Sequence, residues 1–519
     1  MNLAARLRDS ATRLPDTAAL VIPAGSDDAR SLSYRELDER VEAAAAAFAG
    51  AGLAAGDRVA VLLGNSRHFI EAVYGAWRAG LTVVPLNTAL AAQEVATVLA
   101  GSRAKAVVVS EAFAGVLHGV REALPALERV VVAGATHPPM GTRTWNQFLR
   151  GGGETPSRVV GAARSGGELA LLAYTSGTTG RAKGAMLTHD NLLANQRQME
   201  RTRLRVDQGD VVLCALPLFH IYALNVAMGL TLSRGATLLL MDRFDPVQSL
   251  EAVARHRASV IVGAPPMYVA WLNLPGAGGD DLGSVRLAVS GAAPLPRRVL
   301  EGFATGFGVT IWEGYGLTET SPVLTTAAMS PRPRPGSVGR PLPDVELRLL
   351  DDKGRDVAPG DPGEVVVRGP NVFGGYLDDP TATAAVLDPD GWFATGDVGL
   401  FDDGDLFLVD RKSDLIIVSG FNVYPREVEE VLSRHPKVAE AAVVGTPHPY
   451  TGEAVKAVVV LRPGEEATAD DITEFCRRSL ARFKAPEVVE FAAELPHTAS
   501  GKVARRHLRR DRGPQGSGR

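Results

Sequence analysis

The sequence predicts an α/β protein with a large N-terminal domain of layered α/β subdomains plus a β-rich subdomain, and a small mobile α+β C-terminal domain. Three observations support this prediction. The chain has 519 residues, which is too long for one ordinary domain. Short β-branched runs alternate with helix-like segments along much of it, which implies parallel strand pairing. Turns rich in Gly, Pro and Asp then separate strands from residue 336 onward, and a compact region of mixed pattern begins after Asp410.

The first clear helix signal begins at Ser33. Ser33 and Glu36 have the spacing of a capping box, and Gly50 or Gly52 can end the helix after an alanine-rich apolar run. Strands and helices then alternate. Strands are expected at residues 59–63, 81–85, 106–109, 169–174, 211–215, 259–262 and 285–289, and helices at 68–79 and 93–100.

The later part of the chain defines the remaining boundaries. Its predicted strands lie at residues 345–350, 364–368, 405–409, 439–444 and 455–461, and its helices at 425–434 and 470–482. We therefore place the N-terminal domain at residues 1–409, the C-terminal domain at 415–512 and a disordered tail at 513–519.

Composition excludes several classes of protein. A formal net charge of −4 is small for this length, so we expect no nucleic-acid partner. Cys214 and Cys476 lie too far apart in sequence for a cysteine-pair metal motif, and two cysteines form no disulfide framework. Residues 1–20 mix charged with apolar side chains and lack the apolar centre of a secretory signal. A cytoplasmic location is expected.

Residues 211–232 carry no Asp, Glu, Lys or Arg and are long enough to cross a bilayer. Pro217, His220 and Asn225 interrupt this stretch, so a buried core segment is expected and no transmembrane helix. A peripheral contact with a membrane is left open. A basic run near the C-terminus is expected to be a solvated helix end; it comprises Arg505, Arg506, Arg509, Arg510 and Arg512.

A loop rich in glycine and hydroxyl residues follows the strand at residues 169–174. Its sequence is Thr175-Ser176-Gly177-Thr178-Thr179-Gly180-Arg181-Ala182-Lys183-Gly184. Glycines let the backbone approach a polyanion closely, hydroxyl groups add donors, and Lys183 supplies a compensating charge. In the P-loop of kinases and ATPases a lysine follows the second glycine directly, whereas Arg181 stands there in this chain. We therefore expect a phosphate-binding loop of a different fold.

Residues 174–184 resemble the signature loop of adenylate-forming enzymes, which include acyl-CoA synthetases, luciferases and peptide-synthetase adenylation domains. In that family the loop closes on the β- and γ-phosphates of ATP. Residues 216–220, Leu-Pro-Leu-Phe-His, match the next family motif, which places His220 beside the acyl pocket; a hydrogen-bonded core histidine is an equal alternative. The small residues 290–295, including Gly291, Ala292 and Ala293, match the stretch that packs against adenine.

Residues 313–320, Glu-Gly-Tyr-Gly-Leu-Thr-Glu-Thr, are a second strong match. The resemblance implies that Tyr315, followed by Gly316, stacks on adenine, that Thr318 lies near the α-phosphate, and that Glu319 holds Mg²⁺ with Thr178 of the loop. Mg²⁺ prefers oxygen ligands and commonly combines a single carboxylate with ATP phosphates.

Further matches concern the ribose and the two steps of the family's reaction. Asp397 and Arg411 resemble the ribose contacts, and a carboxylate suits two ribose hydroxyls. Lys502, in Ser-Gly-Lys, resembles the cation that bridges the attacking carboxylate and the α-phosphate. In the family a rotation about residues 410–414 then brings the segment containing Gly420 and Phe421 to the site, where it helps to form a thiol tunnel.

One position departs from the family pattern, because Ser413 stands where relatives usually have Lys or Asp at the pivot. The resemblance, which covers nearly the whole chain, is nearest to bacterial long-chain fatty acyl-CoA synthetases. It implies ATP, Mg²⁺ and coenzyme A as cofactors, a carboxylic acid as substrate, and the two-step ligation of that acid to coenzyme A through an acyl-adenylate.

Four alternatives stay open at this point. The enzyme could be a fatty acyl-AMP ligase that loads a carrier protein, although no insertion typical of that group follows the pivot. It could be a ligase for medium-chain or aryl acids. It could be a non-catalytic nucleotide-binding protein, although Lys502, Glu319 and the hydroxyl-rich loop are all present. Luciferase-type oxidation of an adenylate is a weaker option.

Overall fold

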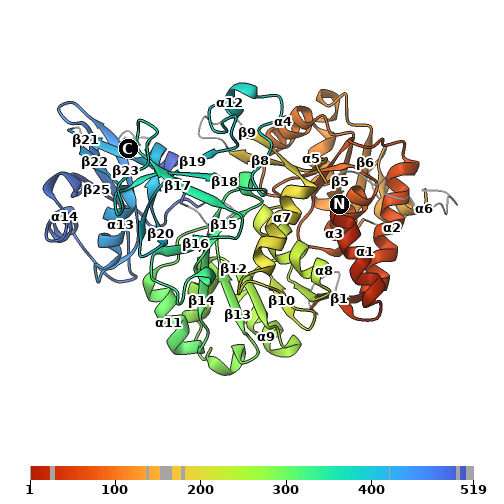
Figure 1. Cartoon of the computed structure of the whole chain (residues 1–519), viewed down its shortest axis with the longest axis horizontal. Coiled ribbons are helices and arrows are strands. Elements are labelled where there is room, and N and C mark those ends of the chain that lie inside the picture. Colours follow the sequence, from red (N-terminus) through yellow and green to blue (C-terminus); the bar gives the residue numbers. More distant parts are fainter. Residues whose placement is uncertain are drawn as a thin grey trace, which may run out of the picture. The chain divides into compact units, whose positions relative to one another are not determined.

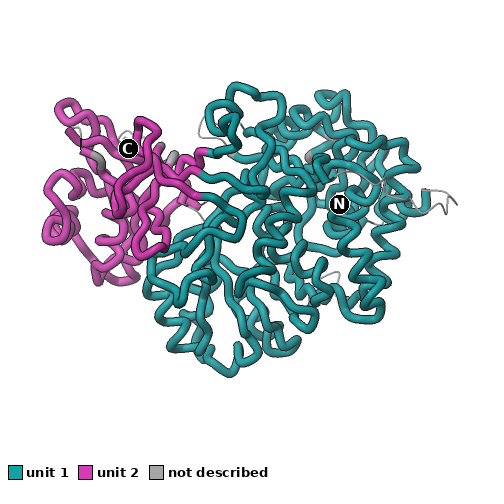
Figure 2. Tube along the Cα trace, in the orientation of Figure 1, with its two compact units in different colours: residues 1–346, 367–393 teal, residues 347–366, 394–519 magenta. Residues whose placement is uncertain are grey.

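The computed structural model describes residues 2–23, 30–135, 139–151, 166–176, 182–419, 421–497 and 503–509. Its contacts divide the chain into unit 1, residues 1–346 and 367–393, and unit 2, residues 347–366 and 394–519 (Figure 2). The division follows contacts, whereas the boundary at residue 409 and the hinge at 410–414 concern movement. Both therefore stay predictions.

Unit 1 begins with a seven-stranded sheet, whose strands β3, β4, β5, β6, β7 and β8 pair in parallel. The strands in spatial order are β7 (Arg143–Thr144), β6 (Arg129–Ala133), β5 (Ala106–Ser110), β3 (Arg58–Leu62), β4 (Thr82–Pro85), β8 (Leu169–Ser176) and β9 (Ala182–Thr188). Strand β9 is the exception, because it pairs antiparallel with β8. The predicted alternation of strands and helices is thus confirmed here.

The helices of this part are α1 (Leu3–Arg13), α2 (Tyr34–Gly50), α3 (Arg67–Arg78), α4 (Ala92–Ser102), α5 (Glu111–His118) and α6 (Trp145–Arg150), with the 3₁₀ turn Arg121–Ala123. Helix α2 begins with the predicted capping box, in which the Ser33 side chain accepts from the Glu36 N–H and the Glu36 carboxylate accepts from the Ser33 N–H. Val107 and Val109 of β5 and Val95 and Leu99 of α4 lie in one apolar core, so α4 covers a face of the sheet.

The second sheet of unit 1 has six parallel strands at its centre and antiparallel strands at its ends. The strands in spatial order are β2 (Arg30–Ser33), β1 (Ala18–Ile22), β11 (Thr237–Leu240), β10 (Val211–Cys214), β12 (Val260–Gly263), β13 (Leu287–Ser290), β14 (Ile311–Gly316), β15 (Val323–Thr326) and β16 (Ser337–Pro341). Short 3₁₀ turns span Gly279–Leu282, Thr318–Thr320 and Ala327–Met329.

Helices α9 and α11 lie along this sheet (Figure 1). The helices here are α7 (His189–Glu200), a π-helix (Tyr222–Gly229), α8 (Leu230–Arg234), α9 (Pro246–His256), α10 (Pro265–Leu272), α11 (Arg297–Phe307) and α12 (Pro380–Ala384). The apolar stretch 211–232 forms β10, the π-helix and the start of α8, and its side chains are largely buried. No helix within the described ranges has the length and apolarity that a bilayer crossing requires.

Three side chains fix the start of the central parallel strands. Asp210 precedes β10, Ser259 precedes β12, and Arg286 precedes β13. The Asp210 carboxylate accepts from the Ser259 hydroxyl at 2.7 Å and from Nε of Arg286 at 2.8 Å. With this edge of the sheet held, the opposite edge presents the carboxyl ends of β13 and β14, where ligands of open α/β sheets bind.

Unit 2 contains two groups of strands. The first is β17 (Glu346–Leu350), β18 (Gly363–Arg368), β19 (Phe393–Asp402) and β20 (Asp405–Arg411); the second is β22 (Phe421–Val423), β21 (Ile416–Val418), β24 (Gly452–Leu461), β23 (Val438–His448) and β25 (Val488–Phe491). Its helices are α13 (Pro425–Ser433) and α14 (Ala469–Arg477), with 3₁₀ turns at Lys412–Asp414, Arg482–Lys484 and Arg505–His507. Helix α14 was predicted to reach Arg482 and ends at Arg477. The predicted tail, 513–519, lies outside the described residues.

Candidate active site

The predicted phosphate loop lies at the end of a β-hairpin. Strands β8 and β9 are antiparallel, and their last paired residues are Thr175 with Lys183 and Ser176 with Ala182. Lys183 therefore lies directly across from Thr175, next to the loop that joins the two strands. The sequence interpretation missed β9, and helix α7 begins only after it, capped by Thr188. The loop residues Gly177, Thr178, Thr179 and Gly180 lie outside the described residues.

Glu319 lies in the 3₁₀ turn Thr318–Thr320, which follows β14. Its side chain is buried, and its Oε1 accepts a hydrogen bond from the Tyr376 hydroxyl at 2.9 Å. The N–H of Phe373 donates to the backbone carbonyl of Glu319 at 2.8 Å. The segment after β18 thus holds both the backbone and the carboxylate of Glu319.

Buried side-chain amides hold the backbone that follows Glu319 in this turn. Asn371 donates to the carbonyl of Thr320 at 2.8 Å, and the Asn195 side chain donates to the carbonyl of Val323 at 2.8 Å. Asn225 donates to the carbonyl of Ser321 at 2.7 Å. Buried polar groups need such partners, so this set of amides fixes the chain around Glu319.

Tyr376 links Glu319 to Lys183. Its hydroxyl donates to Glu319, and Nζ of Lys183 lies 5.2 Å from the centroid of its ring, in a cation–π contact. Burial, followed by the nearby charge of Glu319, raises the pKa of Tyr376 above its usual value, so its hydroxyl stays protonated near neutral pH. Sequence reasoning missed Tyr376, whose only signal was an aromatic residue between glycines and an acidic turn.

The residues predicted to contact adenine lie at the carboxyl ends of β13 and β14. Gly291, Ala292 and Ala293 come directly after β13, and Tyr315 is near the end of β14. The carboxylate of Glu313 on β14 accepts from the N–H of Leu295 at 3.0 Å, which ties the two segments together. The structure therefore brings these predicted residues to neighbouring strand ends.

Close approach explains two of the small residues at these strand ends. A Cβ added to Gly291 would lie 3.1 Å from the ring of Tyr222, and one added to Gly316 would lie 1.8 Å from the carbonyl oxygen of Pro322. Ala292 has a positive φ of 70°, a left-handed conformation that is uncommon for residues other than glycine. The backbone here is therefore tightly constrained.

His220 ends a short loop that Asn65 holds in place. The Asn65 side chain donates to the carbonyls of Leu216 at 3.0 Å and Met241 at 2.9 Å, and it accepts from the N–H of Leu218 at 2.8 Å. His220 itself is half-buried, and its backbone starts the turn into the π-helix. Asn65 is a second positioning residue that sequence reasoning missed. The role of His220 stays a prediction.

In unit 2, Asp397 and Arg411 are partners across β19 and β20. Nε of Arg411 lies 3.0 Å from Oδ1 of Asp397, and the carboxylate is buried while the guanidinium is partly exposed. The hydroxyl of Thr395 accepts from the N–H of Asp397 at 3.1 Å. The structure thus brings together the two residues predicted to contact ribose.

Arg505 was expected to be solvated, and this was wrong. Its Nη2 donates to Glu429 at 2.7 and 2.8 Å, and its Nη1 lies 3.2 Å from Asp414 and 3.4 Å from Asp410. Only 22% of its side chain is exposed. The basic run therefore includes an ion-pair centre attached to the segment of the predicted hinge.

Lys502 and Gly420 lie outside the described residues. Phe421 is exposed and stacks on Phe483, with ring centroids 4.8 Å apart.

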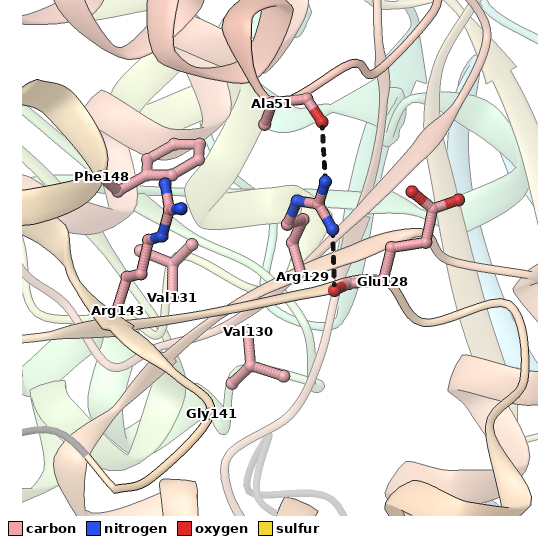
Figure 3. A pocket seen from close by; sticks show the side chains of 8 residues that line it. All are labelled: Ala51, Glu128, Arg129, Val130, Val131, Gly141, Arg143 and Phe148. Carbon is pink, nitrogen blue, oxygen red and sulfur yellow. Dashed lines mark hydrogen bonds between the residues drawn. The ribbon is translucent and has the colours of Figure 1, made fainter. Parts of the chain in front are cut away.

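A separate hollow of about 300 Å³ lies beside β6 and contains none of the predicted site residues (Figure 3). Arg129 and Arg143 line this hollow.

The donor set at Glu319 fits a magnesium ion that arrives with a nucleotide. In the part of the chain that the structure describes, no group of three or more His, Cys, Asp or Glu side chains could hold a metal alone. Glu319 offers one buried carboxylate, oriented by Tyr376, in a turn flanked by threonine hydroxyls. Mg²⁺ commonly combines one or two carboxylates with phosphate oxygens and water.

Known families match both parts of the chain. A family described as "AMP-binding enzyme" matches residues 7–377, and "AMP-binding enzyme C-terminal domain" matches residues 427–502. The chain therefore belongs to the AMP-binding enzyme family, and the predicted resemblance and fold class are confirmed.

Relatives and solved structures agree with this assignment. A "Long-chain-fatty-acid--CoA ligase" of Yersinia pestis is 38% identical, covering 92% of this chain and 89% of its own. A "Feruloyl-CoA synthase" of Amycolatopsis sp is 39% identical, covering 92% and 94%. The structure of ATP-bound MatB from Rhodopseudomonas palustris superimposes with a TM-score of 0.89 at 33% identity, covering 98% of both chains.

Proposed function

We propose that the protein is an AMP-forming fatty acid–CoA ligase. It converts ATP and a carboxylic acid to an acyl-adenylate and pyrophosphate, and then transfers the acyl group to the thiol of coenzyme A with release of AMP. The observation that carries this proposal is the contact of Tyr376 with both Glu319 and Lys183, because it joins two predicted ATP-phosphate elements from distant parts of the chain. Family membership and the ligase relatives support it.

The first half-reaction forms a bond between a carboxylate oxygen and the α-phosphorus of ATP and breaks the bond to pyrophosphate. Both reactants are anions, so cations and hydrogen-bond donors must offset their repulsion. We assign Lys183 and the hydroxyl-rich loop to the β- and γ-phosphates, and Thr318 and Lys502 to the α-phosphate. Glu319, with Thr178, would hold Mg²⁺, which neutralises phosphate charge when it is bound.

The nucleoside is assigned to two further sets of residues. Gly291, Ala292, Ala293 and Tyr315 would contact adenine, and their place at the carboxyl ends of β13 and β14 supports this assignment. Asp397 would accept hydrogen bonds from the ribose hydroxyls beside Arg411. His220 would border the carboxylate end of the acyl pocket.

The second half-reaction needs no nucleophile from the protein. The thiol sulfur attacks the acyl carbon, the bond to AMP breaks, and positioning provides most of the rate. We assign Gly420 and Phe421 to the thiol path, and the exposure of Phe421 supports a contact with a ligand. A cytoplasmic location is proposed because both cysteines are unpaired, buried thiols.

The test is pyrophosphate release with fatty acids of graded length and with ferulate, each with and without coenzyme A, followed by mass spectrometry of the products. We expect acyl-CoA from fatty acids. Acid-dependent release without thioester would favour a carrier-protein ligase, and no release with any acid would contradict the enzymatic proposal.

The role of Lys502 can be tested by separating the two half-reactions. Lys502→Ala should lower adenylation at least 100-fold, because it removes a cation that is favourable mainly in the transition state. Thioester formation from supplied acyl-adenylate should be nearly unchanged. Lys353→Ala, at an exposed position of unit 2, is the control and should match the wild type in both steps. Equal loss of both half-reactions in Lys502→Ala would contradict the assigned role.

A further inference from the structure

Tyr376 contacts the two charged groups that the proposed function assigns to ATP and its metal ion. Its hydroxyl donates to Oε1 of Glu319 at 2.9 Å, and its ring face lies 5.2 Å from Nζ of Lys183. Glu319 is buried, so its carboxylate depends on its hydrogen-bond donors for orientation. One side chain therefore constrains both the carboxylate and the ammonium group.

The backbone of Tyr376 is itself fixed to the hairpin that carries Lys183. Tyr376 forms an antiparallel bridge with Ala185 of β9, and the N–H of Leu377 donates to the carbonyl of Gly184 at 2.9 Å. The N–H of Tyr376 donates to the Thr383 hydroxyl at 2.9 Å. The hairpin and the Glu319 turn are thus connected through this short segment.

The ring is also fixed from the side of the turn. Phe373 packs edge-on against Tyr376, with ring centroids 5.0 Å apart, and the N–H of Phe373 donates to the carbonyl of Glu319 at 2.8 Å. Because the backbone of Glu319 and the ring of Tyr376 are held by the same residue, the hydroxyl meets the carboxylate in one defined orientation.

We infer that Tyr376 is a positioning residue that orients Glu319 for the magnesium ion of Mg–ATP through its hydroxyl, and aligns Lys183 with the phosphates through its ring. The inference rests on the proposed function and adds a residue to it. Groups that orient a metal ligand typically change metal affinity 10- to 100-fold when removed. The hydroxyl can be removed alone or together with the ring, and a comparison of the two variants distinguishes the two roles.

Tyr376→Phe keeps the ring and removes the hydroxyl. ATP binding should be measured by isothermal titration calorimetry over a range of free Mg²⁺ and in EDTA, without acid, so that no reaction occurs. We expect the Mg²⁺ concentration at half-maximal enhancement of ATP binding to rise about 10-fold. ATP binding in EDTA should change less than about twofold, since the contact with Lys183 remains.

Tyr376→Leu removes the hydroxyl and the ring. It should show the same rise in Mg²⁺ requirement and, in addition, about threefold weaker ATP binding in EDTA, because Lys183 loses the ring face. Tyr34→Phe is the matched control. It also removes a buried tyrosine hydroxyl, which donates to the carbonyl of Ala236 at 2.6 Å, and it should lower the melting temperature without moving the Mg²⁺ midpoint.

An unchanged Mg²⁺ midpoint in Tyr376→Phe would overturn the inference. So would an equal loss of ATP binding with and without Mg²⁺, which is the pattern of a residue that only maintains the fold. If the wild-type protein showed no Mg²⁺-dependent ATP binding, the proposed function itself would fail, and this result is distinct from a failure confined to the variant.

Discussion

Nη2 of Arg505 donates to both carboxylate oxygens of Glu429, at 2.8 and 2.7 Å, across 76 residues of sequence. Nη1 of the same guanidinium lies within 3.4 Å of Asp410 and Asp414. One arginine therefore contacts three carboxyl groups that lie before and within the first helix of the C-terminal region. The last described segment of unit 2 is thereby attached to residues 410–414.

Arg505→Met should destabilise unit 2 by about 3 kcal/mol, because it leaves Glu429 and the buried Asp410 without the cation that contacts them. Burial already raises the pKa of Glu429 and of Asp410, so their charged forms are disfavoured in the folded state. When folding raises the pKa of a carboxyl group, the resulting stability is present at pH values below the ordinary pKa. It is lost as the pH rises through the folded-state pKa. The destabilisation measured by urea unfolding of the full chain should therefore be smaller at pH 5 than at pH 8.

The control for this variant is Arg355→Met. Arg355 also makes two bonds to one carboxylate, at 3.0 and 2.7 Å to Asp351, but 70% of its side chain is exposed. Its loss should cost less than about 1 kcal/mol. Equal effects of the two substitutions would show that burial is not the reason for the importance of Arg505.

Gly316→Ala should lower kcat/KM for ATP at least tenfold. The added Cβ would lie 1.8 Å from the backbone carbonyl oxygen of Pro322. A backbone atom cannot move aside as the end of a flexible side chain can, so the turn that carries Thr318 and Glu319 must shift. Steady-state pyrophosphate release over a range of ATP concentrations measures this effect. Gly306→Ala, at a helical position with open space around the new Cβ, should match the wild type. Similar kinetics of both variants would contradict this account.

Asp210→Asn should destabilise unit 1 by about 1 kcal/mol at pH 7. Burial acts to raise the pKa of Asp210, but hydrogen bonds from Arg286, Asp207 and Ser259 outweigh it and lower the pKa below the ordinary 3.8. When folding lowers the pKa of a carboxyl group, the folded state gains stability at pH values above the ordinary pKa. This stability is lost as the pH falls through the folded-state pKa. Urea unfolding should therefore show a difference between variant and wild type that narrows below about pH 3.8. A constant difference across this range would contradict the assigned ion pair.

Local patterns allowed much of the fold to be predicted. The capping box at Ser33 and Glu36 set the start of α2 correctly, because both partners lie within one helical turn. Strand β9 was missed because residues 182–188 contain no β-branched residue before Thr188. The segment forms a strand through its antiparallel hydrogen bonds with β8, which its own composition does not indicate. The helix that ends at Arg477 was predicted to continue to Arg482. The prediction ran too far because no Gly or Pro directly follows Arg477 to mark the end of the helix.

Candidate site residues that belong to short motifs could be named from the sequence, whereas residues defined by distant partners could not. Tyr376 meets Glu319 across 57 residues, and the sequence around Tyr376 carries no sign of that contact. Arg505 reads as one of several solvated arginines, because its carboxylates lie 76 to 95 residues earlier in the chain. The motif locates Glu319, but the side chains that orient it become visible only in the folded structure.

The order in which the chain is made has a consequence for the Glu319 turn. Residues 367–393 belong to unit 1 but are synthesised after residues 347–366, which belong to unit 2. Asn371, Phe373 and Tyr376, which hold the turn, all lie in this late segment. A nascent chain that has emerged only to residue 346 lacks these partners, so the nucleotide binding proposed for Glu319 would have to await the synthesis of residues 367–393.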